Sequence, residues 1–133
     1  MKNVHYISVT EDSINKIKKG AFLTVKANNA LNTMTIGWAT FGVVWSKPIM
    51  MVAVRSSRHT FKIIESAKDF TVTVPMEDMH KEIAFCGSKS GRNLDKFKMC
   101  KQSATASLPS SFVVIEQFFY RSSNKIRFNY VIG

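Results

Sequence analysis

The chain has 133 residues, of which 45% are hydrophobic and 21% are charged, and its formal net charge at pH 7 is +10. This length and composition predict one folded domain and exclude a disordered chain. The longest apolar run, Ile49 to Val54, is too short to cross a bilayer, and residues 1–13 contain no sustained apolar stretch. We therefore expect neither a membrane span nor a secretory signal, and the cytoplasm is the expected location.

The first half of the chain alternates between strand patterns and turns. Residues 11–19 predict a short helix or turn that ends at Gly20. Strict alternation predicts a half-buried strand from Ala21 to Ala27, followed by a polar turn over 28–32. Residues 33–45 are rich in β-branched and aromatic side chains, and the two glycines within them indicate bulges or close approaches to the backbone.

The middle of the chain continues with short elements. Ile49 to Val54 is continuously apolar, which predicts a strand buried on both faces. An apolar stripe predicts a helix over 58–67, and a period of two predicts a strand over 70–74 that Pro75 closes. A second short helix is expected over 79–86, with Asp78 as its cap and Gly87 as its stop.

The last third carries weaker signals. Leu94 to Met99 suits a helical turn, while Phe112 to Tyr120 and Lys125 to Ile132 are strand-prone on either side of a turn at 122–124. Many short strands with a few inserted helices predict a mainly β, barrel-like domain, and they disfavour a doubly wound sheet.

The segment 55–60, Arg-Ser-Ser-Arg-His-Thr, follows a strand and precedes a helix. Guanidinium groups, hydroxyls and free backbone N–H groups at such a position can hold a phosphate, with Arg58 and Thr60 as direct contacts and Ser57 as cap or ligand. The same residues also suit an ordinary capped helix start with solvated charges.

The segment 86–97, Cys-Gly-Ser-Lys-Ser-Gly-Arg-Asn-Leu-Asp-Lys-Phe, offers small residues with accessible backbone donors among three cations. It resembles an anion-binding nest without the Walker spacing, although a solvated surface loop is the plain alternative. Cys86 is expected to be a buried structural thiol, because the two cysteines form neither a metal motif nor a disulfide framework.

Other chemistries find little support in the chain. The three histidines have no partners at metal-binding spacing, no Gly-x-Ser-x-Gly elbow is present, and the nine acidic residues form no suggestive pair, so neither a metal site nor a catalytic side chain is predicted. The basic residues are scattered, which indicates a solvated surface around a site for a small anion, and no nucleic acid partner is expected. If the protein is an enzyme, its chemistry is expected to belong to a bound cofactor.

These segments together resemble one known family. The order and spacing of Asn32-Thr-Met-Thr-Ile-Gly-Trp38, Lys47-Pro48, Val54 to Thr60, Asp69-Phe70 and Cys86 to Phe97 are similar to the flavin reductase-like, flavoredoxin-type group of FMN-binding split barrels. The resemblance covers roughly Gly20 to Met99 and ends near residue 101, beyond which the chain is expected to be divergent or shortened.

The resemblance implies a six-stranded antiparallel Greek-key barrel, a homodimer, and FMN bound near the subunit interface. It places residues 32–35 along the isoalloxazine ring, Trp38 and Thr40 near that ring, and the two basic segments around the phosphate. The cofactor-binding residues that it implies are Asn32, Thr33, Met34, Thr35, Trp38, Thr40, Arg55, Ser57, Arg58, His59, Thr60, Cys86, Gly87, Ser90, Gly91, Arg92 and Lys96.

The implied function is that of an oxidoreductase in which NADH or NADPH reduces the bound FMN. Two alternatives stay open: a flavin-binding or electron-carrier protein without efficient catalysis, and a basic nucleic-acid-binding barrel motivated by the net charge.

Overall fold

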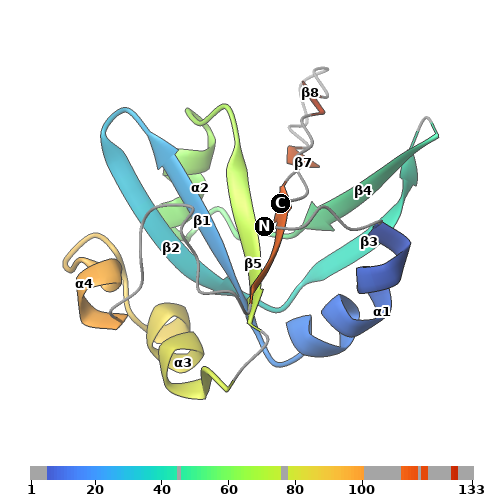
Figure 1. Cartoon of the computed structure of the whole chain (residues 1–133). Helices are drawn as coiled ribbons and strands as arrows, with labels where there is room; N and C mark the ends of the chain where they lie inside the picture. The colour runs from blue at the N-terminus through green and yellow to red at the C-terminus, as the bar shows by residue number, and fades with distance from the viewer. Residues whose placement is uncertain are drawn as a thin grey trace.

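The computed structural model describes residues 6–44, 46–75 and 78–100, together with the backbone of three later strands. The elements in chain order are α1 (Tyr6–Ile17), β1 (Ala21–Ala27), β2 (Ala30–Ile36), β3 (Ala39–Val44), β4 (Lys47–Val52), α2 (His59–Ile64), β5 (Phe70–Pro75), α3 (His80–Ser88), α4 (Lys96–Cys100), β6 (Phe112–Glu116), β7 (Phe118–Phe119) and β8 (Arg127–Phe128). The expected mainly β class with short helices is confirmed (Figure 1).

The strands form an antiparallel four-stranded sheet in the order β2-β1-β5-β6 and two separate pairs, β3-β4 and β7-β8. The described residues thus form three sheets of four, two and two strands. The six-stranded Greek-key barrel therefore stays a prediction. The antiparallel β7-β8 pair fits the expected late hairpin, whose turn at 122–124 lies outside the described residues.

A tight hairpin joins β1 to β2. Asn28 and Asn29 have φ angles of 47° and 63°, and Ala27 pairs directly with Ala30. Asparagine tolerates positive φ, so two residues suffice for the turn. The predicted five-residue turn is therefore too long, and β2 begins at Ala30 instead.

The core is one cluster of buried side chains from the four-stranded sheet, α2, the end of α1 and β4. Leu23, Val25, Val72 and Val74 are each at most 1% exposed, and they share one cluster with Ile63 of α2. Phe22 is also buried, so the start of β1 is covered on both faces and the half-buried prediction for this strand is wrong there.

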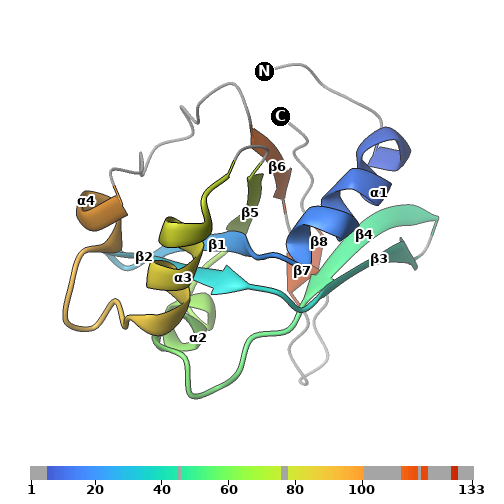
Figure 2. The same cartoon turned by 90° about the horizontal axis from the view of Figure 1, so that it is seen from below.

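The β3-β4 pair projects from the main sheet beside α1, as Figure 2 shows. Met51 is 48% exposed although Met50 beside it is buried. Successive side chains of a strand point to opposite faces, and Met50 belongs to the core cluster while Met51 points away from it. The prediction that this strand is buried on both faces is therefore wrong.

Helix boundaries differ from the predicted ones by a few residues. The helix expected over 11–19 begins earlier, at Tyr6, and α2 is shorter than the predicted 58–67. Met79 occupies the cap position of α3, one residue after the predicted cap, although the Asp78 carboxylate accepts a 3.1 Å hydrogen bond from the N–H of His80. Within the described residues, no helix is both long enough and apolar enough to cross a membrane.

Strand β2 forms an edge of the main sheet, and α3 and α4 lie beside it (Figure 1). The Thr35 hydroxyl donates a 2.6 Å hydrogen bond to the carbonyl of Ile83 in α3. The segment between β4 and α2 passes the same strand, so loops from distant parts of the sequence meet along β2.

Candidate functional site

The outer edge of β2 presents backbone groups toward α4. Lys96 Nζ donates a 2.9 Å hydrogen bond to the carbonyl oxygen of Thr33, which shows that this carbonyl faces away from β1. Backbone direction alternates along a strand, so the N–H and C=O of Thr35 face the same side as those of Thr33. The edge therefore offers polar backbone groups to a neighbouring ligand.

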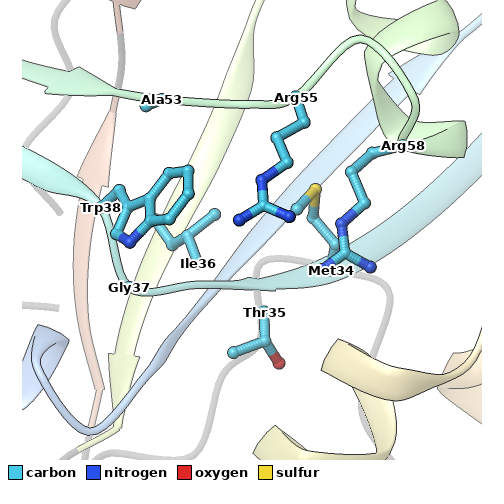
Figure 3. A pocket seen from close by; sticks show the side chains of 8 residues that line it. All are labelled: Met34, Thr35, Ile36, Gly37, Trp38, Ala53, Arg55 and Arg58. Carbon is cyan, nitrogen blue, oxygen red and sulfur yellow. The ribbon is translucent and has the colours of Figure 1, made fainter.

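The first cavity, which we call the strand cavity, has a volume of about 100 Å³ and lies over the end of β2. Figure 3 shows Arg55 and Arg58 reaching across it from the segment after β4, with Trp38 on the opposite side. Its lining residues are Met34, Thr35, Ile36, Gly37, Trp38, Ala53, Arg55 and Arg58.

An exposed aromatic side chain borders the strand cavity. Trp38 is 57% exposed, and the Arg55 guanidinium lies 4.6 Å from the centre of its ring. A cation over an indole face is a favourable contact that holds both side chains in place. A flat ring could stack in this position beside a positive charge.

The second cavity, which we call the loop cavity, has a volume of about 170 Å³ and is strongly basic. It shares Met34 and Arg58 with the strand cavity, so the two are adjacent. Its lining residues are Asn32, Met34, Ser57, Arg58, His59, Thr60, Ser88, Lys89, Ser90, Gly91, Arg92 and Lys96.

Two loops converge on the loop cavity from positions about 30 residues apart. Arg58 Nη1 donates a 3.1 Å hydrogen bond to the carbonyl oxygen of Gly87, which ties the loop before α2 to the end of α3. In the second loop, the N–H of Arg92 donates to the Ser90 hydroxyl at 3.3 Å. Both basic segments singled out in the sequence therefore face one hollow.

Lys96 is the most deeply placed cation of the loop cavity and is 4% exposed. Its ammonium donates to the carbonyl oxygens of Thr33 and Cys86, at 2.9 and 2.8 Å. Burial lowers its pKa, which the nearby Cys86 thiol partly opposes and the Arg58 charge reinforces. An ammonium has three N–H donors, so one is left for a ligand in the cavity.

The floor of the loop cavity contains a buried polar pair. Asn32 Nδ2 donates a 2.8 Å hydrogen bond to the hydroxyl of Thr60, which is 1% exposed. The backbone of Gly91 lies against this amide so closely that a Cβ at position 91 would overlap the Asn32 side chain. Only glycine lets the second loop approach the floor this closely.

His59 lies at the start of α2 among cations. Burial lowers its pKa below the usual value, and the charges of Arg92, Lys62 and Lys96 lower it further. The neutral form of the imidazole is therefore favoured over the charged form. An anion in the loop cavity would offset these cations and raise its pKa.

The residues predicted from the sequence fall into two groups. The structure brings most of them to the lining of one or both cavities, including the pairs Trp38 and Arg55, and Arg58 and Lys96. The ones outside the lining are Thr33, Thr40, Cys86 and Gly87. Lys96 donates hydrogen bonds to the backbone carbonyl oxygens of Thr33 and Cys86, and Arg58 donates one to that of Gly87. Thr40 is exposed on β3.

Cys86 is buried against α4. Burial and a contact with the Cys100 thiol raise its pKa to about 12, so this thiol is protonated at neutral pH. Its burial fits the structural thiol expected from the sequence, and Cys86 lines neither cavity, so its sulfur does not face a ligand there.

Ser57 and Thr60 have different surroundings from those that the helix start predicts. The cap position of α2 is Arg58, and no side chain makes a capping bond there. Ser57 lines the cavity as an exposed residue, and Thr60 lies on its floor.

Five residues that line the cavities are not among the site residues predicted from the sequence: Ile36, Gly37, Ala53, Ser88 and Lys89. Ser88 and Lys89 lie inside the second basic segment, so the segment as a whole identifies them. Ala53 carries no chemical signal, and only the folding of residues 53–58 over β2 places it there. Within the described part of the chain, no group of three or more His, Cys, Asp or Glu side chains could hold a metal ion.

Comparison with known proteins gives a family match over most of the chain. The model of the flavin reductase like domain matches residues 18–119, well beyond the point near residue 101 where the sequence motifs end. No curated protein matches the chain.

Solved structures share the fold at low sequence identity. Flavoredoxin of Desulfovibrio vulgaris (Miyazaki F) matches with a TM-score of 0.64 and 16% identity, over 83% of this chain and 69% of its own. Flavoredoxin from Methanosarcina acetivorans matches with a TM-score of 0.60 and 22% identity, over 77% of this chain and 60% of its own. An FMN-binding protein from Thermus thermophilus with bound p-hydroxybenzaldehyde matches with a TM-score of 0.59 and 19% identity, over 77% of this chain and 62% of its own. The chain thus spans less than two thirds of the last two structures.

Proposed function

Because the chain belongs to the flavin reductase-like family, we propose that it binds FMN and acts as an FMN-dependent oxidoreductase with NADH or NADPH as electron donor. FMN joins a dianionic phosphate to a flat ring through a ribityl chain. A site for it needs a cationic hollow and an adjoining place for the ring.

One observation carries the proposal: the cationic loop cavity and the strand cavity adjoin and share Met34 and Arg58. The two sequence segments that could each be a solvated loop converge instead on a common hollow. The FMN-binding proteins and flavoredoxins that share this fold support the same ligand.

The residues present fit the two ends of FMN. Arg58, Arg92 and the remaining N–H of Lys96 would hold the phosphate, with Ser57 and Ser90 as hydroxyl donors. The close approach of Gly91 to Asn32 forms a narrow floor that a Cβ would fill.

The ring would lie in the strand cavity, between Trp38 with its stacked Arg55 and the polar edge of β2. When bound, FMN would supply the ring that accepts a hydride. The protein would orient that ring and place backbone donors of β2 and the positive charge of Arg55 beside it. No side chain is needed as an acid or base for hydride transfer itself.

A second copy of the chain is the expected macromolecular partner. Trp38 and Met51 are 57% and 48% exposed; Met51 of β4 pairs with Thr40 of β3, and Trp38 lies two residues before Thr40 at the start of this projecting pair. An apolar surface of this kind next to the strand cavity suits a homodimer in which the ring lies near the interface.

Absorption spectroscopy of the full chain tests the proposal. We expect purified protein mixed with FMN and passed through a desalting column to retain a flavin spectrum, and to bleach when NADH or NADPH is added without oxygen. Retained flavin that neither nucleotide bleaches would identify a flavin-binding or carrier protein without turnover. Colourless protein after FMN addition would overturn flavin binding, and salt-sensitive oligonucleotide binding by such protein would favour a basic nucleic-acid-binding barrel.

A further inference from the structure

Two thiols lie together behind the loop cavity. Cys86 Sγ in α3 and Cys100 Sγ in α4 are 3.7 Å apart, and both cysteines are free thiols. Cys86 is 1% exposed, whereas Cys100 is partly exposed. The sequence gives no disulfide signal for this pair, and the flavin site does not use either sulfur.

The two cysteines bracket the second basic loop. Ser90, Arg92 and Lys96 all lie between them in sequence and all line the loop cavity. Lys96 is one helical turn before Cys100, and its ammonium donates to the carbonyl oxygen of Cys86. A bond between the sulfurs would therefore close the loop that supplies this side of the cavity.

We propose that Cys86 and Cys100 form a reversible intramolecular disulfide that closes the loop 87–99 and holds α4 against α3. The bond is a redox modification site in its own right and requires no bound flavin. Since the sulfurs already touch, a small shift of the short helix α4 brings them to bonding distance.

A low-molecular-weight disulfide such as oxidised glutathione is the oxidant in this step. The Cys100 thiolate attacks one sulfur of glutathione disulfide and releases one glutathione as thiolate, which leaves a mixed disulfide at Cys100. The Cys86 thiolate then attacks Cys100 Sγ and releases the second glutathione. Two protein thiols are oxidised and one glutathione disulfide is reduced to two glutathione thiols, which carry the two protons that the protein thiols lose.

The surroundings assign the order of the two attacks. Cys100 is the more accessible thiol, so it reacts first. The Cys100 contact is one cause of the raised pKa of Cys86, after burial, and the positive charge of Lys96 acts in the opposite direction. Capture of Cys100 as a mixed disulfide removes its contribution, which lowers the pKa of Cys86 and increases the fraction present as thiolate for the second step, while the effect of burial stays.

Peptide mapping tests the proposal on the full chain. The protein is equilibrated with oxidised and reduced glutathione at several ratios, its remaining thiols are blocked, and it is digested with trypsin without reduction. We expect the peptide 82–89 joined to the peptide 99–101, in a monomer that has lost two hydrogen atoms. We also expect slower cleavage after Lys89 and Arg92 in native oxidised protein than in reduced protein, because the closed loop opens less often.

The variant Cys100→Ser supplies the matched control, since it leaves the buried thiol of Cys86 in place. It should show neither the joined peptides nor the protection of Lys89 and Arg92. Glutathione retained on Cys100, a bond between two chains, or no oxidation at any ratio would each overturn the proposal. Because peptide mapping needs no flavin, these outcomes are independent of whether FMN binds; FMN retention by the oxidised and reduced forms is then compared separately.

Discussion

The Asn32 amide donates to the hydroxyl of Thr60 across 2.8 Å, joining β2 to the start of α2 beneath the loop cavity. The backbone of Gly91 rests on that same amide. This arrangement brings an edge strand and both basic loops together, and the expected anion site depends on it.

Gly91→Ala should weaken both stability and FMN binding, because the added Cβ would overlap the Asn32 side chain. Overpacking of this kind typically costs about 1–3 kcal/mol of unfolding free energy. Urea unfolding and FMN titration measure the two effects. Gly42→Ala is the matched control, since the nearest heavy atom to its Cβ would be Ile49 Cγ1 at 3.9 Å, an ordinary contact. Equal behaviour of the two variants would contradict the close approach.

Arg58→Ala should weaken FMN binding much more than riboflavin binding, because Arg58 faces the loop cavity where the phosphate is expected. A charge-assisted hydrogen bond is worth about 1.5–3 kcal/mol, which corresponds to about 10–150-fold in the dissociation constant. Fluorescence titration with both flavins gives the comparison.

Arg55→Ala is the control for that experiment, because Arg55 lines the strand cavity and not the loop cavity. We expect it to weaken FMN and riboflavin by similar factors. If Arg58→Ala instead lowers both affinities equally, the phosphate does not bind in the loop cavity.

Lys96→Met should destabilise the protein and lower FMN affinity. The apolar side chain has a similar length but leaves the carbonyl oxygens of Thr33 and Cys86 without their donor. An unsatisfied buried acceptor costs about 1–3 kcal/mol, part of which the removal of a buried charge offsets. Thermal unfolding measures the loss, and Lys98→Met on the exposed side of the same helix should leave the melting temperature nearly unchanged.

His59 should titrate below pH 6.5 in the free protein, since burial and the neighbouring cations lower its pKa. The unfolded chain binds this proton at higher pH than the folded chain does, so the contribution of His59 to stability is present above pH 6.5. It is lost as the pH falls through 6.5 toward the folded-state pKa.

FMN should raise the pKa of His59, because a phosphate dianion in the loop cavity offsets the cations around the imidazole. NMR titration of the histidine ring protons follows this shift. Riboflavin lacks the phosphate and should leave the pKa closer to that of the free protein; an equal shift with both ligands would place the phosphate away from His59.

Local patterns predicted much of the secondary structure. The alternation over Ala21–Ala27 gives β1 with its boundaries, and the pattern ended by Pro75 gives β5. Both segments pair on two sides in one sheet, so their local preferences agree with their surroundings. Local patterns do not report burial reliably in β4, which ends at Val52. Its continuous apolar run predicts that both faces are buried, but Met51 is exposed.

The sequence alone also determined the chemistry available to the site: two basic, hydroxyl-containing segments and an aromatic strand in the order of a known family. Only the tertiary structure decided that these segments face one hollow, that Lys96 is buried between two carbonyl oxygens, and that Cys86 lies against Cys100. The reason is physical. Composition and periodicity report the nearest few residues, whereas these relationships join residues between 10 and 63 positions apart, through the path of the chain around the edge of β2.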